Sequence, residues 1–387
     1  MNKQDHIIRR FDEVFDLQMG KTPNRKIPSF FGGENVWLSI RDMGAKYLNE
    51  SNEHITDDAV KASGIKVVKK GTVIMSFKLT VGKCGITSCD LYTNEAILAF
   101  NVKKGFSISP VFLYYYLQRY KWQGTNKAVM GLTLNKATIS KQIIDIPPLE
   151  KQERIVAELD LLSGIIDKKK EQIKAYDQLA QSIFYTMFGD PIDNPKGWET
   201  KKLGEECTEI KYGTSQPASE NGKYKYLRMC NITYNGSLDL SDVRYIDISD
   251  DEVEKYIVRF GDILFNRTNS LDLIGKTCMF DLDEPMIIAG YIIRVRLTKR
   301  LNPRYISALF NLPTMKLLLK KMAKGAVNQA NINSKELASI LIPLPPLSLQ
   351  QEFAEKVESI ERQKALIRQS IDEVQTMFDY TMDKYFG

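Results

Sequence analysis

Two segments of this 387-residue chain contain side chains that could support catalysis. The segment Gly275–Thr277 ends like a phosphate-binding loop, but that motif requires another glycine at the position that Ser270 occupies. Asp193 and the segment 199–201 resemble the carboxylate–lysine pattern of metal-dependent nucleases, at a shorter spacing and within a stretch typical of a linker. Neither segment completes its motif, so we expect no catalytic residue and no nucleotide or metal site in this chain.

The histidines, the cysteines and the composition exclude further classes. The only histidines are His6 and His54, so a His-based triad or metal cluster is not expected. The five cysteines are scattered and form no CxxC pair, which argues against a zinc ribbon or a disulfide framework. The chain is 43% hydrophobic and 26% charged, without a signal-peptide pattern and without an apolar run near the roughly 18 residues that span a bilayer. We therefore expect a cytoplasmic, globular binding protein with no membrane association.

Basic and polar side chains cluster in loops that follow short predicted strands. Arg, Lys, Asn and Gln carry donors and acceptors that match base edges, while Lys, Ser, Thr and backbone N–H groups suit phosphates. For any single residue of this kind, a solvated surface role is the alternative. The candidate DNA contacts are Arg41, Lys78, Lys83, Lys127, Arg228, Asn266, Arg267, Asn269, Lys276, Asn328 and Gln329.

The chain also contains an internal repeat. The segment 143–152 reads IIDIPPLEKQ and the segment 341–350 reads LIPLPPLSLQ, which is an offset of 198 residues. Farther upstream the correspondence is looser, as between Gly82-Lys83 and Gly275-Lys276. The repeat therefore indicates a head–tail–head–tail order, in which the tails are similar and the heads have diverged.

We divide the chain accordingly into head one (residues 1–149), a first tail and linker (150–190), head two (191–342) and a second tail (343–387). Their net charges are +8, −2, +3 and −3, respectively. Positive charge in the two long segments favours anion-facing heads joined by structural tails. Short β-branched and aromatic runs predict mixed, strand-rich heads, with helical stretches near 110–120 and 303–323.

Each tail has the pattern of a long amphipathic helix. Apolar residues recur at alternating spacings of four and three after each proline pair, which is the heptad pattern of a coiled coil. The prolines suit helix entry, and Gly189 and Pro191 would end the first helix. The predicted seam residues are Ile155, Leu159, Leu162, Ile166, Ile173, Ile183, Phe353, Val357, Ile360, Ile367, Ile371 and Phe378.

A single helix with one apolar stripe needs a partner in water. The nearest partner for each tail is the other tail, and a pseudo-twofold axis between the two halves would make the helices antiparallel. Lys364 would then face Tyr176, and Lys169 would face Ile371, so neither lysine would meet a like charge. The alternative is that each helix packs on its own head.

The sequence resembles the specificity subunit of Type I restriction-modification systems. The resemblance rests on the two Pro-Pro-Leu-x-x-Gln segments at 147–152 and 345–350, the linker at 187–198, and the segment Gly261–Thr268 with its following Gly-Lys pair. Head one departs from this pattern, because Ser76-Phe77-Lys78 stands where head two has Asn-Arg-Thr.

The resemblance implies an α+β fold in which two similar target recognition domains are joined by two long helices in an antiparallel, pseudo-twofold coiled coil. Each domain would read one half of an asymmetric, bipartite double-stranded DNA site, while the helices set the spacing. Two methyltransferase subunits would dock on the helices, and motor-nuclease subunits would join that complex. The partners would supply S-adenosylmethionine, ATP and Mg²⁺ chemistry, so this chain itself would need no cofactor.

Two other classes stay open from the residues alone. One is a stand-alone DNA endonuclease or a two-headed DNA-binding regulator, for which Asp193 is the residue to test. The other is a coiled-coil scaffold without a nucleic-acid role, which would not bind DNA even at low salt.

Overall fold

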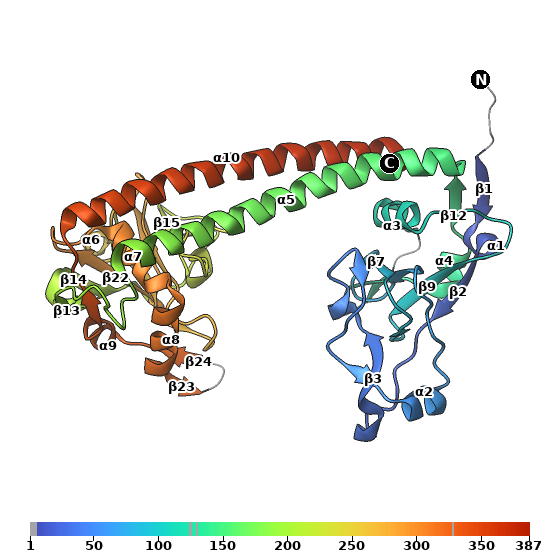
Figure 1. The fold of residues 1–387 in the computed structure, drawn as a ribbon, viewed down its shortest axis with the longest axis horizontal. Helices are drawn as coiled ribbons and strands as arrows, with labels where there is room; N and C mark the ends of the chain where they lie inside the picture. Colours follow the sequence, from blue (N-terminus) through green and yellow to red (C-terminus); the bar gives the residue numbers. More distant parts are fainter. Residues whose placement is uncertain (1–5, 124–125, 129–130, 327–328) are drawn as a thin grey trace. The chain divides into compact units, whose positions relative to one another are not determined.

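A computed structural model describes residues 6–123, 126–128, 131–326 and 329–387 of the chain. Contacts divide it into two compact units: unit 1 contains Met1–Lys169 and Ser370–Gly387, and unit 2 contains Lys170–Gln369. Each unit therefore holds one predicted head and a part of both long helices, α5 (Leu149–Phe188) and α10 (Leu347–Phe386) (Figure 1). The boundaries between the two units lie within α5 and α10. The four segments predicted from the sequence instead follow the order of heads and tails along the chain.

Head one contains a five-stranded sheet and a three-stranded sheet. The first has the order β2 (Phe15–Met19), β9 (Ile97–Val102), β6 (Val73–Ser76), β7 (Cys84–Thr87) and β4 (Tyr47–Leu48). The second has the order β5 (His54–Ile55), β3 (Phe31–Leu38) and β8 (Tyr92–Thr93). Two strand pairs complete the head: β1 (Ile7–Arg10) with β12 (Ile143–Ile146), and β10 (Asn126–Ala128) with β11 (Gly131–Thr133).

The helices of head one are short. The α-helices are α1 (Phe11–Val14), α2 (Asp57–Ser63), α3 (Pro110–Arg119) and α4 (Lys136–Ser140), and the 3₁₀ turns are η1 (Pro28–Phe30) and η2 (Ile40–Asp42). Ser109 caps α3 through a hydrogen bond from the Phe112 N–H to its side chain, and proline occupies the first turn. These local signals explain why the predicted helix near 110–120 forms.

Head two is built on the same plan. Its first sheet has the order β14 (Cys207–Tyr212), β22 (Ile292–Leu297), β18 (Ile263–Asn266) and β20 (Thr277–Met279). The second has β16 (Arg244–Ile246), β15 (Tyr224–Leu227), β21 (Met286–Ile288) and β17 (Ile257–Val258). The third has β19 (Thr268–Asn269), β24 (Gln329–Asn331) and β23 (Lys324–Ala326), and β13 (Thr200–Lys202) pairs with β25 (Leu341–Pro343).

The helices of head two include one departure from the sequence-based expectation. They are α6 (Asp250–Tyr256), α7 (Pro303–Asn311), α8 (Pro313–Met322) and α9 (Ser334–Ala338), with the 3₁₀ turns η3 (Leu203–Glu206) and η4 (Met229–Asn231). The predicted single stretch 303–323 is two helices, because Leu312 adopts an extended conformation before Pro313. A residue before proline disfavours the helical conformation, so the break follows from Pro313 itself.

Strand register shows that the two heads correspond residue by residue in their sheets. In head one Ser76 lies opposite Ile97, and in head two Asn266 lies opposite Ile292. The parallel pairs match as well, since Leu38 lies opposite Thr93 and Leu227 opposite Ile288. The two heads, whose sequences are only loosely similar, therefore share the same strand pairing but carry different side chains.

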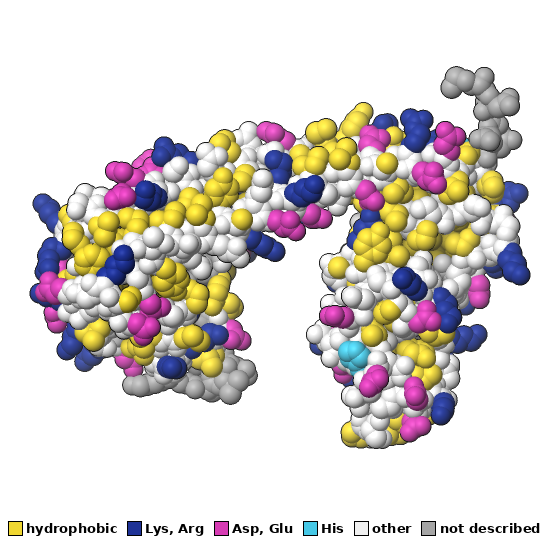
Figure 2. All heavy atoms as spheres, viewed as in Figure 1, with side chains coloured by type: hydrophobic (Ala, Val, Ile, Leu, Met, Phe, Trp, Pro, Cys, Tyr) yellow, Lys and Arg dark blue, Asp and Glu magenta, His cyan; other side chains and the backbone are white. Residues whose placement is uncertain are grey.

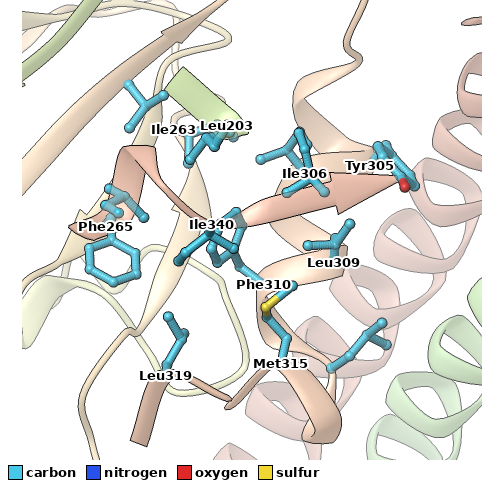
Figure 3. Packing of buried hydrophobic residues seen from close by; sticks show 14 of the residues in the cluster. Leu203, Ile263, Phe265, Tyr305, Ile306, Leu309, Phe310, Met315, Leu319 and Ile340 are labelled. Carbon is cyan, nitrogen blue, oxygen red and sulfur yellow. The ribbon is translucent and has the colours of Figure 1, made fainter. Parts of the chain in front are cut away.

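The core of head two continues onto the long helices. Leu203, Ile263, Phe265, Ile306, Leu309 and Phe310 belong to one buried cluster (Figure 3), which also includes Tyr305 and, from the long helices, Phe184, Phe188 and Phe353. The ring of Tyr305 stacks on Phe184 with centroids 5.5 Å apart. In unit 1 a smaller cluster joins Phe112 and Tyr115 of α3 to Ile155 and Leu159 of α5 and Met382 of α10. Each head is thus packed against the helices of its own unit.

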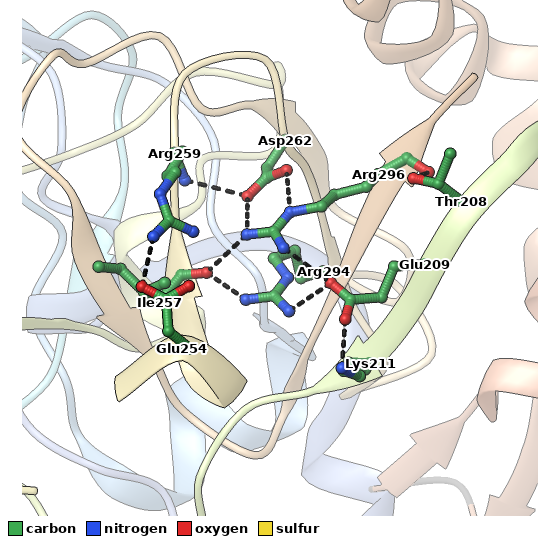
Figure 4. Close-up of polar contacts among 9 residues, drawn as sticks. All are labelled: Thr208, Glu209, Lys211, Glu254, Ile257, Arg259, Asp262, Arg294 and Arg296. Carbon is green, nitrogen blue, oxygen red and sulfur yellow. Dashed lines mark hydrogen bonds and ion pairs between the residues drawn. The ribbon is translucent and has the colours of Figure 1, made fainter. Parts of the chain in front are cut away.

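A buried ionic network joins the two larger sheets of head two (Figure 4). The Arg294 side chain is fully buried, donates to the Ile257 carbonyl and lies 2.5 Å from the Glu209 carboxylate. Arg296 donates to the same carboxylate at 3.0 Å and to Asp262 at 3.0 Å. Register places Ala99 of head one at the position of Arg294, so head one has an apolar strand where head two has this network.

Within each unit the long helices run antiparallel, as predicted. In unit 2 the Phe184 ring meets Phe353 at 5.4 Å, and the Lys364 ammonium lies 2.6 Å from Asp177. Phe184 follows Asp177 along α5, whereas Phe353 precedes Lys364 along α10, so the directions are opposite. In unit 1 the Tyr385 hydroxyl donates to Glu158 at 2.6 Å.

The predicted seam residues lie in the buried or half-buried stripe of these helices. Ile155, Leu159, Leu162, Ile166, Phe353 and Ile360 are buried, and Ile173, Ile183, Val357, Ile367, Ile371 and Phe378 are half-buried. Lys364 faces Asp177 and also lies 2.7 Å from Glu361, rather than lying opposite Tyr176 alone. The long α5 helix ends at Phe188, and Gly189 follows it with a φ of +81°, which a residue with a Cβ rarely adopts.

Candidate nucleic-acid interface

In each head a hairpin of the main sheet ends in a polar tip. The strands β6 and β7 carry the tip 77–82 in head one, and β18 and β20 carry the longer tip 267–275 in head two. The tips close in the same way: the Ser76 N–H donates to the Lys83 carbonyl at 2.9 Å, and the Asn266 N–H donates to the Lys276 carbonyl at 2.8 Å. Four predicted DNA contacts lie in the tip of head two or at its base, namely Asn266, Arg267, Asn269 and Lys276. A fifth, Arg228, lies at the start of the neighbouring turn η4.

A short 3₁₀ turn follows the neighbouring strand and is fixed by a capping box. In head one the Ser39 N–H and hydroxyl both donate to the Asp42 carboxylate, each at 2.7 Å. In head two the Arg228 N–H donates to the Asn231 side chain at 2.9 Å. Burial opposes ionisation of Asp42, but hydrogen bonds from Asn52 and Ser39 outweigh it and lower the pKa of this carboxyl group. The turns η2 and η4 are therefore held in one conformation by their own residues.

A lysine at the base of each tip reaches the first carbonyl of the capped turn. The Lys83 ammonium donates to the Ile40 carbonyl at 3.1 Å, and the Lys276 ammonium donates to the Met229 carbonyl at 2.7 Å. The Lys276 side chain is 8% exposed, and burial lowers its pKa. The tip and the turn of each head thus form one connected edge.

A second hairpin joins this edge at the same register in both heads. The Leu134 N–H donates to the Phe77 carbonyl at 2.8 Å, and the Ile332 N–H donates to the Arg267 carbonyl at 2.9 Å. Lys127 lies on β10 and Gln329 on β24, so their backbones belong to these hairpins. Asn328, another predicted contact, lies outside the described residues.

The remaining predicted contacts differ in their surroundings. In head one Arg41 is exposed and Lys78 is half-buried, and the Lys78 ammonium lies 5.5 Å from the Phe77 ring. In head two the Arg228 guanidinium donates to the Asp242 carboxylate at 2.7 Å. The Asn269 side chain accepts from the Ser270 N–H at 2.9 Å.

Asn266 and Arg267 lie at the point where β18 enters the tip. Asn266 is fully buried, and its side-chain amide nitrogen has no hydrogen-bond partner among the described residues. The Arg267 guanidinium lies 4.8 Å from the centre of the Tyr212 ring. Tyr212 in turn accepts a hydrogen bond from the Ser334 N–H at 2.8 Å, which fixes the ring. Sequence reasoning did not identify Tyr212, because 55 residues separate it from Arg267 and only the strand order β14, β22, β18 brings them together.

The described part of the chain contains neither a cluster of metal-binding side chains nor a membrane-spanning helix. Over those ranges, no group of three or more His, Cys, Asp or Glu residues could hold a metal ion. The helices that are described contain no stretch long and apolar enough to cross a bilayer. The side chains of the edge themselves offer hydrogen bonding, positive charge and aromatic stacking.

Comparison with protein families gives two matches along the chain. The model for the Type I restriction modification DNA specificity domain matches residues 5–175 and again residues 195–376. Each match covers nearly all of one head and the larger part of the long helix that follows it, which is the repeat seen in the sequence.

Curated relatives carry similar names. The MjaIX specificity subunit of a Type I restriction enzyme from Methanocaldococcus jannaschii is 24% identical over 62% of this chain and 61% of its own length. The EcoKI specificity subunit from Escherichia coli K12 is 28% identical over 56% of this chain and 50% of its own. The chain thus spans between half and about three fifths of these two relatives. The MjaVIII specificity subunit is 23% identical over 96% of this chain and 90% of its own length.

Solved structures show the same fold. A chain from a study of complex assembly and conformational transition in the type I R-M system aligns over 99% of this chain with a TM-score of 0.58 and 19% identity. The S subunit of a Type I restriction-modification system from M. genitalium aligns over 100% of this chain with a TM-score of 0.52 and 13% identity. At these identities the likeness concerns the fold alone.

Proposed function

Because this chain belongs to the family of the Type I restriction modification DNA specificity domain, we propose that it is the DNA-specificity subunit of a Type I restriction-modification complex. Each head reads one half of an asymmetric, bipartite double-stranded DNA site, and the two long helices set the spacing of the halves. The chain contributes recognition and no catalytic residue of its own. Methyltransferase and motor-nuclease subunits supply the S-adenosylmethionine, ATP and Mg²⁺ chemistry.

One observation carries this proposal: the two heads present different side chains on edges that are built in the same way. The strand register, the capped turn and the lysine hydrogen bond recur in both. The side chains on this frame differ, with Arg41 and Lys78 in head one and with Arg267 and Asn269 in head two. Base edges are distinguished by the donors and acceptors that face them, so different side chains imply different half-sites.

We assign direct contacts with bases or phosphates to Arg41, which is exposed, and to Lys78, Arg228, Arg267 and Asn269, which are half-buried. We keep Lys127, Asn328 and Gln329 as proposed contacts on the strength of their residue types. Contacts with phosphates would make binding depend on salt but not on sequence, whereas contacts with base edges would set specificity.

The long helices supply a spacer and a docking surface. Forty residues at about 1.5 Å each give roughly 60 Å, which exceeds one DNA turn of about 34 Å. Hydrophobic side chains remain on the surface of these helices (Figure 2), including Leu161, Leu366, Met377 and Tyr380, which are 65%, 60%, 58% and 72% exposed. We assign the docking of two methyltransferase subunits to these helices, together with the neighbouring faces around Glu158, Lys168, Glu355 and Arg362.

Methylome sequencing of the host, with and without the gene for this chain, tests the function. We expect one split, asymmetric motif whose methylation depends on the chain, and the chain with its methyltransferase partner should protect that motif from nuclease digestion. The absence of any bipartite motif that depends on the chain would overturn the proposal. Metal-dependent cleavage by the chain alone, lost in Asp193→Ala, would instead favour a nuclease.

A further inference from the structure

The two lysines at the bases of the tips were expected to contact DNA, but their surroundings suggest another role. Lys83 and Lys276 occupy the same place in the ladder, directly after Gly82 and Gly275. Each ammonium donates to the first carbonyl of the neighbouring capped turn, at 3.1 Å in head one and 2.7 Å in head two. The heads have diverged in most other side chains of this edge, so the recurrence marks a function that both share.

The burial of these side chains limits their access to a phosphate. The Lys276 side chain is 8% exposed and its ammonium is already bonded to the Met229 carbonyl. Lys83 is half-buried and bonded in the same way. An ammonium that turned outward to a phosphate would leave a carbonyl of the turn without its charged donor, which costs more than the same change at an exposed lysine.

The capping box and the lysine do different things for the turn. The capping box fixes the conformation of η2 and η4, because its hydrogen bonds lie within four consecutive residues. The lysine joins the turn to a hairpin about 40 to 50 residues away in sequence, so it fixes where the turn lies. The turn then presents Arg41 in head one and the exposed Met229 and Cys230 in head two.

We propose that Lys83 and Lys276 are positioning residues for DNA specificity: each holds the capped turn against its hairpin tip, so that the exposed side chains of the turn meet the bases of one half-site. Arg41 would hydrogen-bond to base edges in its half-site, and Met229 would make an apolar contact, for which the thymine methyl group is the matching partner. This inference rests on the proposed function, because it names how the same edge achieves its specificity.

The test measures the salt dependence and the base preference of the chain bound to its methyltransferase partner. The probes are duplexes that carry the methylated motif or single changes within either half. Replacing Lys276 with methionine keeps the apolar stem and removes the donor. We expect Lys276→Met to lower discrimination about tenfold at one half-site, to leave the other half-site unchanged, and to leave the slope of log K against log salt unchanged. Lys83→Met should lower discrimination by a similar factor at the other half-site and should also leave the salt slope unchanged.

Two further variants separate positioning from direct contact. Lys78→Met is the comparison on the same tip, because no hydrogen bond from Lys78 to the turn is present among the described residues. As a direct DNA contact, Lys78 should reduce the salt slope by about 0.9 when it is replaced, which the loss of a positioning lysine should not do. Arg41→Ala should lose the same preference as Lys83→Met, and the double variant should be no worse than either single one, because both act through one contact. If Lys276→Met lowers the melting temperature, Lys83→Met provides the test instead, because Lys83 is half-buried and its replacement should disturb folding less.

Two outcomes would overturn the inference. A reduced salt slope with intact discrimination in Lys276→Met or Lys83→Met would make these lysines phosphate contacts. Unchanged slope and unchanged discrimination in both would remove them from recognition. Failure of the proposed function is distinguishable, because the wild-type complex would then show no preference between the methylated motif and a scrambled duplex.

Discussion

Gln152 and Gln350 make the same three hydrogen bonds in the two halves of the molecule. The Gln152 side chain donates to the Pro147 and Ser107 carbonyls at 2.8 and 3.0 Å and accepts from the Ser109 N–H at 2.9 Å. The Gln350 side chain donates to the Pro345 and Arg300 carbonyls at 2.8 and 3.2 Å and accepts from the Asn302 N–H at 2.8 Å. Both side chains are fully buried. The glutamine of the repeated Pro-Pro-Leu-x-x-Gln motif thus joins the start of each long helix to the cap of a head helix, α3 or α7.

We predict that Gln350→Leu destabilises unit 2 by about 1–3 kcal/mol. The leucine would fill a similar volume but leave the Asn302 N–H and two carbonyls without their partner in a buried site. Urea denaturation of the full chain measures the change in the free energy of unfolding. Gln351→Leu is the control, because Gln351 is exposed on the same helix and its replacement should have little effect. Equal stability of the two variants would contradict a structural role for the motif glutamine.

We predict that Ile166→Asp lowers the melting temperature strongly. Ile166 is 6% exposed in the stripe between the helices, so the substitution buries a charge without a partner, at a cost of several kcal/mol. Thermal unfolding followed by circular dichroism provides the measurement. Leu161→Asp is the matched control on the same helix, because Leu161 is 65% exposed. If both variants melt at the wild-type temperature, the helix seam is assigned to the wrong face.

The same Leu161→Asp variant tests the docking surface. We expect it to fold normally but to bind the methyltransferase partner at least tenfold more weakly, because a carboxylate would replace an exposed apolar contact. Gel filtration of the mixed subunits, or titration calorimetry, measures this effect. Glu355→Gln, on a face also assigned to docking, removes only a charge from an exposed position and should weaken binding less than Leu161→Asp does. Wild-type affinity of Leu161→Asp would remove this residue from the docking surface.

The helices and the repeat could be predicted from sequence because their signals are local and periodic. Apolar spacing fixes which face of α5 and α10 is buried, and the proline pairs and Gly189 mark their ends. The heptad pattern predicted Tyr176 opposite Lys364, whereas the ion pair of Lys364 is with the next residue, Asp177. A heptad pattern gives the buried face of a helix but not the rotamers of its side chains. The antiparallel direction followed from symmetry and is confirmed within each unit.

The edge of each head could be predicted only in part. Basic and polar residue types made Arg41, Lys78 and Arg267 candidates, and their contact with DNA stays a prediction. The hydrogen bond from Lys276 to Met229, the aromatic platform of Tyr212 and the buried Arg294 network all join residues that are distant along the chain. Such contacts depend on strand register, for which the diverged heads carry no periodic signal.

We predict that Lys316→Met changes the pH dependence of stability. Burial, together with the charge of Lys276, lowers the pKa of Lys316 to about 7 in the folded chain. Between about pH 7 and 10 the unfolded chain therefore binds a proton here that the folded chain does not, so this group makes stability rise with pH. Lys316→Met removes this titrating group and with it this rise of stability with pH. Its stability relative to wild type should be greatest at and below pH 7, and should fall by up to about 1.4 kcal/mol per pH unit above it.

Urea denaturation at pH 7, 8 and 9 measures this difference. Lys320→Met is the control from the next turn of α8: hydrogen bonding to Asp272 raises the pKa of Lys320, so its contribution is lost only above the ordinary lysine range. The Lys320 variant should therefore show a difference from wild type that is constant from pH 7 to 9. A constant difference for Lys316→Met as well would show that this lysine is charged in the folded chain throughout the range.

We predict that Arg267→Ala weakens recognition of a single half-site by about 1–3 kcal/mol. The guanidinium lies over the Tyr212 ring at 4.8 Å, and this stacking restricts its directions, so we expect its outer N–H groups to reach a base edge. Tyr212→Leu should reproduce part of the loss without touching a base, because it removes the platform. Binding of duplexes changed at each position of both half-sites, measured by fluorescence anisotropy at fixed salt, gives the pattern. A loss that is uniform across all sequences, with a smaller salt slope, would make Arg267 a phosphate contact instead.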